Sequence, residues 1–357
     1  MRVLVTGGCG FIGSAVIRHM IAATDHSVVN IDKMTYAASE DALGFARTHN
    51  RHLLVRADVA DAGAMRAVFE THRPDAVMHL AAETHVDRSI DGPGPFIHTN
   101  VLGTYTLLDA ARSYAAGLSD DGRAAFRFHH VSTDEVFGAL DPTDPPFTET
   151  TAYDPRSPYS ASKAASDHLV RAWHHTYGLN TLVSNTTNNY GPWQFPEKLV
   201  PLVLLNALDG RALPVYGDGS NIRDWLFVED HAEALVRVLE RGQVGATYAI
   251  GARQPRTNLQ VVEAICDTLD ERLPDPAGPR RRLIEFVADR PGHDFRYEID
   301  PSVTERALDW RAPHDFSAGL AATVDWYLSN RPWWEGIRAG RYGGQRLGSG
   351  SPSRVAA

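Results

Sequence analysis

The chain begins with an apolar segment that runs directly into a glycine-rich loop. Residues 2–6 (Arg-Val-Leu-Val-Thr) predict a buried parallel strand, and an apolar helical pattern follows the loop through Ile21. The loop reads Gly7-x-x-Gly10-x-x-Gly13. Glycine permits a tight turn here and lets backbone N–H groups approach a pyrophosphate at the positive end of the helix. The spacing departs from G-x-G-x-x-G, so the loop alone is a weak signal of dinucleotide binding.

Strand and helix patterns alternate beyond the loop. Strands are predicted at 28–31, 52–55, 76–80, 126–131 and 181–184, and helices at about 61–71, 95–116 and 159–177. This alternation implies a parallel sheet covered by helices on both faces. The predicted fold class is α/β, a Rossmann-type doubly wound parallel sheet with a smaller mixed α/β substrate-binding lobe.

A change in composition from Asn188 onwards predicts the second lobe, because turn-rich segments appear there. We expect residues 1–187 and about 225–251 to form the dinucleotide-binding domain. Residues from about 188–224 and 252–335 are expected to form the second lobe. Residues 336–357, rich in Gly, Arg and Ser, are expected to form a flexible tail.

Composition excludes several classes of protein. No stretch approaches the roughly 20 apolar residues that span a bilayer, and Met1 leads straight into the first strand, which leaves no room for a signal peptide. A net charge of −9 argues against a nucleic-acid partner. Cys9 and Cys266 cannot form a disulfide framework. We therefore expect a cytoplasmic protein with small-molecule partners and no membrane or nucleic-acid partner.

Asp32 strengthens the dinucleotide interpretation. It ends the second predicted strand, nineteen residues past Gly13, where a carboxylate can accept hydrogen bonds from a ribose 2′-hydroxyl. A carboxylate there repels a 2′-phosphate, so NAD is favoured over NADP. The adjacent Lys33 weakens this preference slightly, since a cation tolerates phosphate.

Tyr159 and Lys163 stand at i and i+4, so a helix would place them on one face. A nearby ammonium and a positive nicotinamide would lower the tyrosine pKa from its reference of about 10. The phenol could then take a hydroxyl proton as hydride leaves the same carbon. An ordinary amphipathic helix explains the same spacing, but the dinucleotide context favours catalysis.

Ser132-Thr133-Asp134-Glu135 adds two carboxylates ahead of that pair. Ser-x-x-Glu is also a helix capping box. A capped helix requires an apolar periodic run afterwards, whereas this segment soon gives way to a proline-rich loop. It also leaves the carboxyl end of a parallel strand, where such folds place ligand chemistry. Catalysis is therefore favoured over capping.

Lysine occurs only at Lys33, Lys163 and Lys198, among 35 basic residues. A chain that otherwise uses arginine keeps lysine where a compact ammonium matters, although genome composition explains the same count. The sixteen histidines include two adjacent pairs, but adjacent histidines point in different directions. No carboxylate stands near them at a spacing typical of metal ligands. We predict no metal.

Over residues 1 to about 330 the chain resembles the extended short-chain dehydrogenase/reductase superfamily and, within it, the dTDP-glucose 4,6-dehydratases. The matching segments include Asp32-Lys33-Met-Thr35-Tyr36, His79-Leu-Ala-Ala-Glu-Thr-His85, Ser132-Thr-Asp-Glu135, Ser157-Pro-Tyr-Ser-Ala-Ser-Lys163, Asn188 to Lys198, Tyr216 to Trp225 and Asp289-Arg-Pro-Gly-His-Asp294. Phe137, Trp193 and Phe295 depart from the residues that the family pattern leads us to expect.

The resemblance implies a cycle on dTDP-glucose with NAD as a retained cofactor. Tyr159 would deprotonate the C4 hydroxyl, with Thr133 bonded to the same oxygen. Glu135 would act as base at C5 and Asp134 as acid for the departing C6 hydroxyl, with Lys163 as the partner of Tyr159. Hydride would then return to C6.

The resemblance also implies two sets of binding residues and an assembly. The implied cofactor-binding residues are Gly7, Gly10, Phe11, Ile12, Gly13, Asp32, Lys33, Thr35, Asp58, Val59, Leu80, Ala81, Ala82, Thr99, Tyr159, Lys163 and Asn188. The implied substrate-binding residues are Thr84, His85, Thr133, Asn188, Lys198, Leu199, Pro214, Tyr216, Arg223, Asn258, Arg290, His293 and Tyr297. A homodimer packed through the helices at about 95–116 and 159–177 is implied as well.

Three alternatives stay open. A nucleotide-sugar 4-epimerase or decarboxylase of the superfamily would share NAD, Tyr159 and Lys163, but it would not need an acid for a C6 leaving group. A non-catalytic NAD-binding regulator would need neither that pair nor Asp134 and Glu135. The residues also leave the nucleobase undecided between thymine and uracil.

Overall fold

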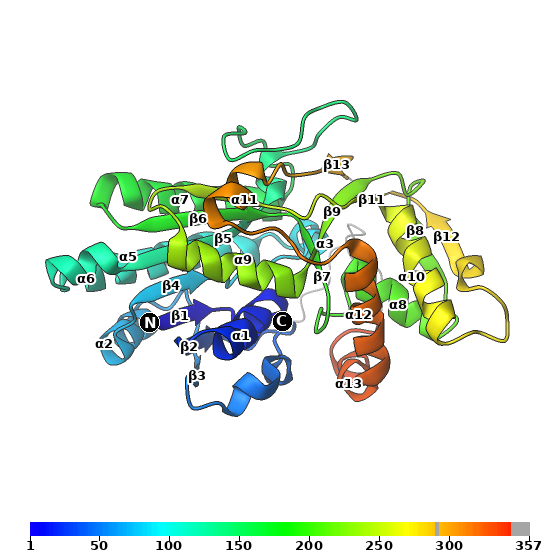
Figure 1. The fold of residues 1–357 in the computed structure, drawn as a ribbon, viewed down its shortest axis with the longest axis horizontal. Coiled ribbons are helices and arrows are strands. Elements are labelled where there is room, and N and C mark those ends of the chain that lie inside the picture. Colours follow the sequence, from blue (N-terminus) through cyan, green and yellow to red (C-terminus); the bar gives the residue numbers. More distant parts are fainter. Residues whose placement is uncertain (290–292, 344–357) are drawn as a thin grey trace.

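The computed structural model describes residues 1–289 and 293–343. Seven parallel strands form the central sheet in the order β3-β2-β1-β4-β5-β6-β10 (Figure 1). Their bounds are β1 Arg2–Thr6, β2 Ser27–Asp32, β3 His52–Arg56, β4 Ala76–His79, β5 Arg127–Thr133, β6 Thr181–Thr186 and β10 Thr247–Ile250. The order of the first six strands is that of a Rossmann fold, which confirms the predicted fold class.

Helices cover both faces of this sheet because the side chains of each strand alternate between them. Val3 and Val5 pack on one face with α1 (Phe11–Ala23) and α9 (Val228–Arg241). Leu4 packs on the opposite face with α2 (Ala62–His72), α5 (Gly103–Ala116) and α7 (Pro158–Tyr177). Two apolar layers, one on each face, therefore hold the strands in position, and with them the edge of the sheet where their carboxyl ends lie.

A second lobe lies beyond those carboxyl ends (Figure 1). Its larger sheet contains β7 (Asn188–Tyr190), β9 (Ile222–Phe227), β11 (Pro255–Thr257) and β13 (Arg296–Tyr297), and β8 (Leu213–Tyr216) pairs with β12 (Ile284–Val287). Its helices are α8 (Leu199–Leu208), α10 (Asn258–Arg272), α12 (Phe316–Ser329) and α13 (Arg331–Gly340). These elements share an apolar core of their own.

Shorter helical elements connect the larger ones. They are η1 Glu40–Thr48, α3 Val86–Asp91, α4 Gly94–Phe96, η2 Ile97–Leu102, α6 Asp120–Ala125, η3 Asp134–Phe137, η4 Arg280–Leu283 and α11 Ser302–Leu308. The helix expected at about 95–116 is thus three consecutive pieces, of which η2 is a π-helical segment. None of the helices in the described ranges has the length and apolar composition that a bilayer crossing needs.

The domain division differs from the prediction in detail. β9 joins the second lobe's sheet along its whole length, so the chain returns to the first domain at α9 rather than at residue 225. Leu308 and Trp310, expected in the second lobe, lie in the first domain's core. The sequence could not reveal this, since both lobes use similar apolar residues. That the two lobes are separate domains remains a prediction.

The tail prediction is wrong for residues 336–343. Residues up to Gly340 complete α13, and the side chains of Ile337 and Tyr342 are buried against Phe195. These apolar residues find partners in distant segments, which overrides the polar local composition. The remainder of the expected tail, 344–357, lies outside the described residues.

Candidate active site

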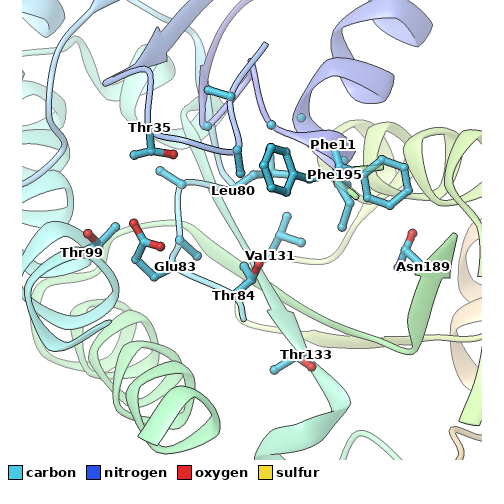
Figure 2. Close-up of a pocket in the computed structure, with 18 of the residues that line it drawn as sticks. Phe11, Thr35, Leu80, Glu83, Thr84, Thr99, Val131, Thr133, Asn189 and Phe195 are labelled. Atoms are coloured by element: carbon cyan, nitrogen blue, oxygen red, sulfur yellow. The ribbon is translucent and has the colours of Figure 1, made fainter. Parts of the chain in front are cut away.

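A cavity of about 300 Å³ lies where the carboxyl ends of the central strands meet the second lobe. Figure 2 shows side chains from both lobes directed into it, among them Phe11, Leu80 and Thr133 from the first and Asn189 and Phe195 from the second. All of the predicted catalytic residues line this cavity: Thr133, Asp134, Glu135, Tyr159 and Lys163. The fold thus brings together residues that the chain separates by as many as 30 positions.

The glycine loop is packed too tightly for larger residues. A Cβ atom on Gly13 would lie 2.2 Å from the Gly7 carbonyl oxygen, and Gly7 itself has a φ of +70°. Gly10 precedes α1 without a side-chain cap, so the first N–H groups of this long helix face the cavity's glycine wall. Free N–H groups at a helix start form an anion site, so this loop fits the pyrophosphate of a dinucleotide.

Asp32 lies at the end of β2 beside the glycine loop. Its carboxylate accepts hydrogen bonds from the Cys9 N–H at 2.9 Å and the Met34 N–H at 2.8 Å. Burial raises the Asp32 pKa, while these two hydrogen bonds lower it. Each oxygen keeps accepting capacity toward the cavity, which is what ribose hydroxyls would use.

Lys33 faces Thr99 across the same wall. Its Nζ donates to Thr99 Oγ1 at 3.0 Å and lies 3.6 Å from the Asp58 carboxylate. The other predicted cofactor-binding residues that line the cavity are Gly7, Gly10, Phe11, Ile12, Gly13, Thr35, Val59, Leu80, Ala81, Ala82 and Asn188. Asp58 does not line it, and its predicted role in cofactor binding stays a prediction.

Tyr159 sits in the first turn of α7, where Ser157 and Ser160 form a reciprocal capping box. Burial and the Glu135 carboxylate raise the Tyr159 pKa well above its ordinary value, and a hydrogen bond with Thr133 opposes them. The expected lowering of this pKa by an ammonium and a nicotinamide together stays a prediction, because it includes the charge of a bound cofactor. Lys163 Nζ is directed at the Val131 carbonyl oxygen, 2.9 Å away, rather than at the phenol.

The buried Lys163 side chain lies next to His130, which in turn contacts Asp167. His130 Nε2 lies 3.5 Å from Lys163 Nζ and 3.1 Å from the Asp167 carboxylate. Burial lowers the Lys163 pKa to about 8, and Asp167 opposes that shift. Asp167 also accepts a hydrogen bond from Tyr153 at 2.7 Å. This fully buried carboxylate therefore supplies a negative charge beneath the ammonium.

The chain bends where the acid pair requires it. β5 ends at Thr133, and the short helix η3 starts at Asp134. Thr133 caps this helix by accepting from the Glu135 N–H at 3.3 Å, so Ser132 does not form the capping box that its spacing allowed. Both carboxylates consequently face the same cavity instead of opposite sides of a strand.

Asp134 is the more buried of the two acids, with 1% of its surface exposed. Its Oδ2 has no hydrogen-bond partner among the described residues. Burial and the nearby Glu135 raise its pKa well above the usual carboxyl range. A carboxyl group that holds its proton can act as a general acid, while Glu135 beside it is only partly buried.

The predicted substrate residues fall into two groups. Thr84, Thr133, Asn188 and Lys198 line the cavity, and Lys198 Nζ donates to the Thr84 carbonyl oxygen at 3.0 Å. The following predicted residues do not line it: His85, Leu199, Pro214, Tyr216, Arg223, Asn258, His293 and Tyr297. Arg290 lies outside the described residues.

Arg223 illustrates the second group. Its guanidinium stacks 4.2 Å from the Tyr297 ring and donates to the carbonyl oxygens of Asp294 and Phe295. These contacts hold the segment after residue 293 against β9. A phosphate contact by Arg223 therefore stays a prediction.

Sequence reasoning missed several lining residues. Tyr36, Glu83, Phe195 and Glu197 all face the cavity, and Tyr36 donates to Glu197 at 2.9 Å. In the sequence, the only indication that these residues belong to the site was that they lie in segments that resemble the dehydratase family. Across residues 1–289 and 293–343, no group of three or more His, Cys, Asp or Glu side chains could hold a metal ion.

Comparison with known proteins identifies the family. The family model described as GDP-mannose 4,6 dehydratase matches residues 4–323. dTDP-glucose 4,6-dehydratase 1 of Escherichia coli K12 is 56% identical over 350 residues, covering 96% of this chain and 97% of the relative. The chain belongs to the dTDP-glucose 4,6-dehydratase family.

Solved structures place the chain in the same dehydratase family. A dTDP-glucose 4,6-dehydratase double mutant from Streptomyces venezuelae, with NAD bound, has a TM-score of 0.86 and 42% identity, covering 94% of this chain and 100% of that one. The UDP-glucose 4-epimerase of Thermus thermophilus, in complex with NAD, has a TM-score of 0.80 and 28% identity, covering 92% and 100%. Dehydratases and epimerases thus share this fold.

Proposed function

We propose that the protein is an NAD-dependent enzyme that dehydrates dTDP-glucose to dTDP-4-keto-6-deoxyglucose. One observation carries the proposal: Asp134 and Glu135 both line the cavity that Tyr159 and Lys163 line. An epimerase needs only the latter pair. The dTDP-glucose 4,6-dehydratase 1 of Escherichia coli K12 matches this chain over 97% of its own length, which supports the same activity.

NAD held by the glycine loop and Asp32 would supply the hydride chemistry at C4 and C6 of the sugar. Tyr159 takes the proton of the C4 hydroxyl, and Thr133, within hydrogen-bond reach of the phenol, orients the same oxygen. Because the raised Tyr159 pKa reflects burial and the Glu135 charge, the unliganded protein keeps the phenol protonated. The positive charge that favours the phenolate must therefore include the cofactor's own.

Elimination divides the acid and base roles between neighbours. The 4-ketone acidifies the C5 proton, and Glu135 removes it. Asp134 gives its proton to the C6 hydroxyl, which leaves as water. Burial of Asp134 keeps that proton available, and each such group contributes about 10²–10⁴-fold. Hydride at C6 and a solvent-derived proton at C5 complete the product.

Incubation with dTDP-glucose in deuterated water tests the proposal. The expected product is a 4-keto-6-deoxy sugar with deuterium at C5 and with no net formation of NADH. Recovery of a galactosyl epimer would favour the epimerase alternative. Parallel assays with UDP-glucose measure the nucleobase preference.

A homodimer through the helices at the outer face of the sheet is supported by exposed apolar side chains. Ile97, Leu102 and Tyr105 on η2 and α5, and Tyr177 at the end of α7, are 43–52% exposed. Clustered apolar side chains on a surface mark interaction sites. Leu102→Glu should shift sedimentation toward the monomer, whereas Leu273→Glu, a 44% exposed leucine on another face, should not.

Cytoplasmic location remains a prediction from the sequence.

A further inference from the structure

We propose that Trp333 and Arg341 of the C-terminal helix region position residues 36–39 (Tyr-Ala-Ala-Ser), called here the cofactor loop, and so slow the release of NAD. The inference rests on the proposed function, because retention matters most for a cofactor that every turnover regenerates. Of the two donors, Arg341 lies in the segment 336–357 that the sequence predicted to be a flexible tail, and Trp333 lies just before it.

The cofactor loop forms a wall of the dinucleotide cavity. Tyr36, Ala37 and Ala38 line it beside Asp32 and the other residues that follow β2. The Ser39 N–H donates to the Cys9 carbonyl oxygen at 2.8 Å, which ties the loop to the glycine turn. A displacement of this loop would therefore disturb both the ribose side and the pyrophosphate side of the cofactor site.

Two hydrogen bonds from the second lobe hold the loop in place. Trp333 Nε1 donates to Ser39 Oγ at 3.2 Å, and Arg341 Nη1 donates to the Ala38 carbonyl oxygen at 2.9 Å. Both donors come from a segment about 300 residues further along the chain. The loop and the two side chains that hold it therefore belong to different lobes.

An apolar contact supports the same junction. Phe195, Ile337 and Tyr342 form a buried cluster, and Tyr36 and Ala37 pack against it. The Tyr36 ring meets Phe195 edge to face with centroids 5.4 Å apart, and its hydroxyl donates to Glu197. Since Tyr36 and Phe195 also line the cavity, the junction closes one side of the cofactor site.

The test removes the two hydrogen bonds and keeps the packing. The double variant Trp333→Phe/Arg341→Ala retains a ring at 333, and Arg341→Ala alone is a milder version. Arg338→Ala is the matched control, because Arg338 lies on the same helix but pairs with Asp209 of the second lobe. Purified holoenzyme is diluted, and protein-bound NAD is measured over time together with the melting temperature and the KM for dTDP-glucose.

Loss of two hydrogen bonds predicts NAD release about ten- to thirtyfold faster in the double variant. We expect added NAD to restore its rate, the KM for the sugar to stay unchanged, and Arg341→Lys to retain NAD like the native protein. Release at the native rate in the double variant, or equal acceleration in Arg338→Ala, would overturn the proposal. Failure of the proposed function is distinguishable, since the native holoenzyme would then form no dehydrated sugar at any rate of NAD release.

Discussion

Replacing Asp134 by asparagine should separate oxidation from elimination. The substitution keeps the side-chain shape in a position that is 1% exposed but removes the proton that the proposed mechanism gives to the C6 hydroxyl. Tyr159, Lys163 and Glu135 stay in place. Oxidation at C4 should therefore continue while water departs slowly.

The magnitude follows from the role of a single general acid. Such a group contributes about 10²–10⁴-fold, which equals about 3–5 kcal/mol of barrier at 1.36 kcal/mol per tenfold. The substitution should not lower the free energy of unfolding. The Asp134 pKa is raised in the folded protein, so its protonated form contributes stability that is lost as pH rises through that raised value. The Asp134→Asn variant has no such loss, and its stability relative to the native protein should rise with pH above about 4.

The assay combines single-turnover kinetics with isotope analysis. In Asp134→Asn, reduced nicotinamide should accumulate, and dTDP-glucose recovered from deuterated water should carry deuterium at C5, because Glu135 still removes that proton. In Glu135→Gln, C4 oxidation should also occur but elimination should stop, and recovered sugar should lack deuterium at C5. Elimination at the native rate in Asp134→Asn would refute the acid assignment. Deuterium at C5 in Glu135→Gln would refute the base assignment.

Two further perturbations probe the cofactor and the buried charges. Gly13→Ala should greatly reduce NAD content and destabilise the protein by about 1–3 kcal/mol, because its Cβ would lie 2.2 Å from the Gly7 carbonyl oxygen. Gly92→Ala, where a Cβ meets nothing within 4 Å, is the control, and equal NAD content in the two variants would contradict the reasoning. Asp167→Asn removes the charge that supports the Lys163 ammonium, so the Lys163 pKa should fall below about 8 and the alkaline limb of the rate profile should move to lower pH. An unchanged alkaline limb would show that Asp167 does not set the charge of Lys163.

Much of the site was predictable because its signals are local. The glycine loop and Asp32 depend on spacing within one strand–helix–strand unit, and Tyr159 and Lys163 share a helical face by periodicity. Residues whose roles depend on distant partners were not predictable. Glu197 pairs with Tyr36 and Arg88 across 161 and 109 positions, and no local pattern encodes such contacts.

Charge states show the same division. The sequence placed Tyr159 four residues before Lys163 and suggested a lowered tyrosine pKa. In the chain without a cofactor, burial and the Glu135 carboxylate raise that pKa instead, because desolvation depends on everything packed around the phenol. The acid role of Asp134 likewise depends on its burial, which its neighbours in the chain do not reveal.

The sequence by itself determined the order of strands and helices, the glycine loop and the chemical identity of the proposed catalytic groups, since these follow from short-range pattern and residue type. Tertiary structure alone decided that the chain bends after Thr133 so that both acids face one cavity. It also decided that the first residues of the expected tail complete α13 and bring Arg341 to the cofactor loop. The physical reason is that burial and long-range contacts set the direction of a side chain and the ease of moving a proton, and both arise only when distant segments meet.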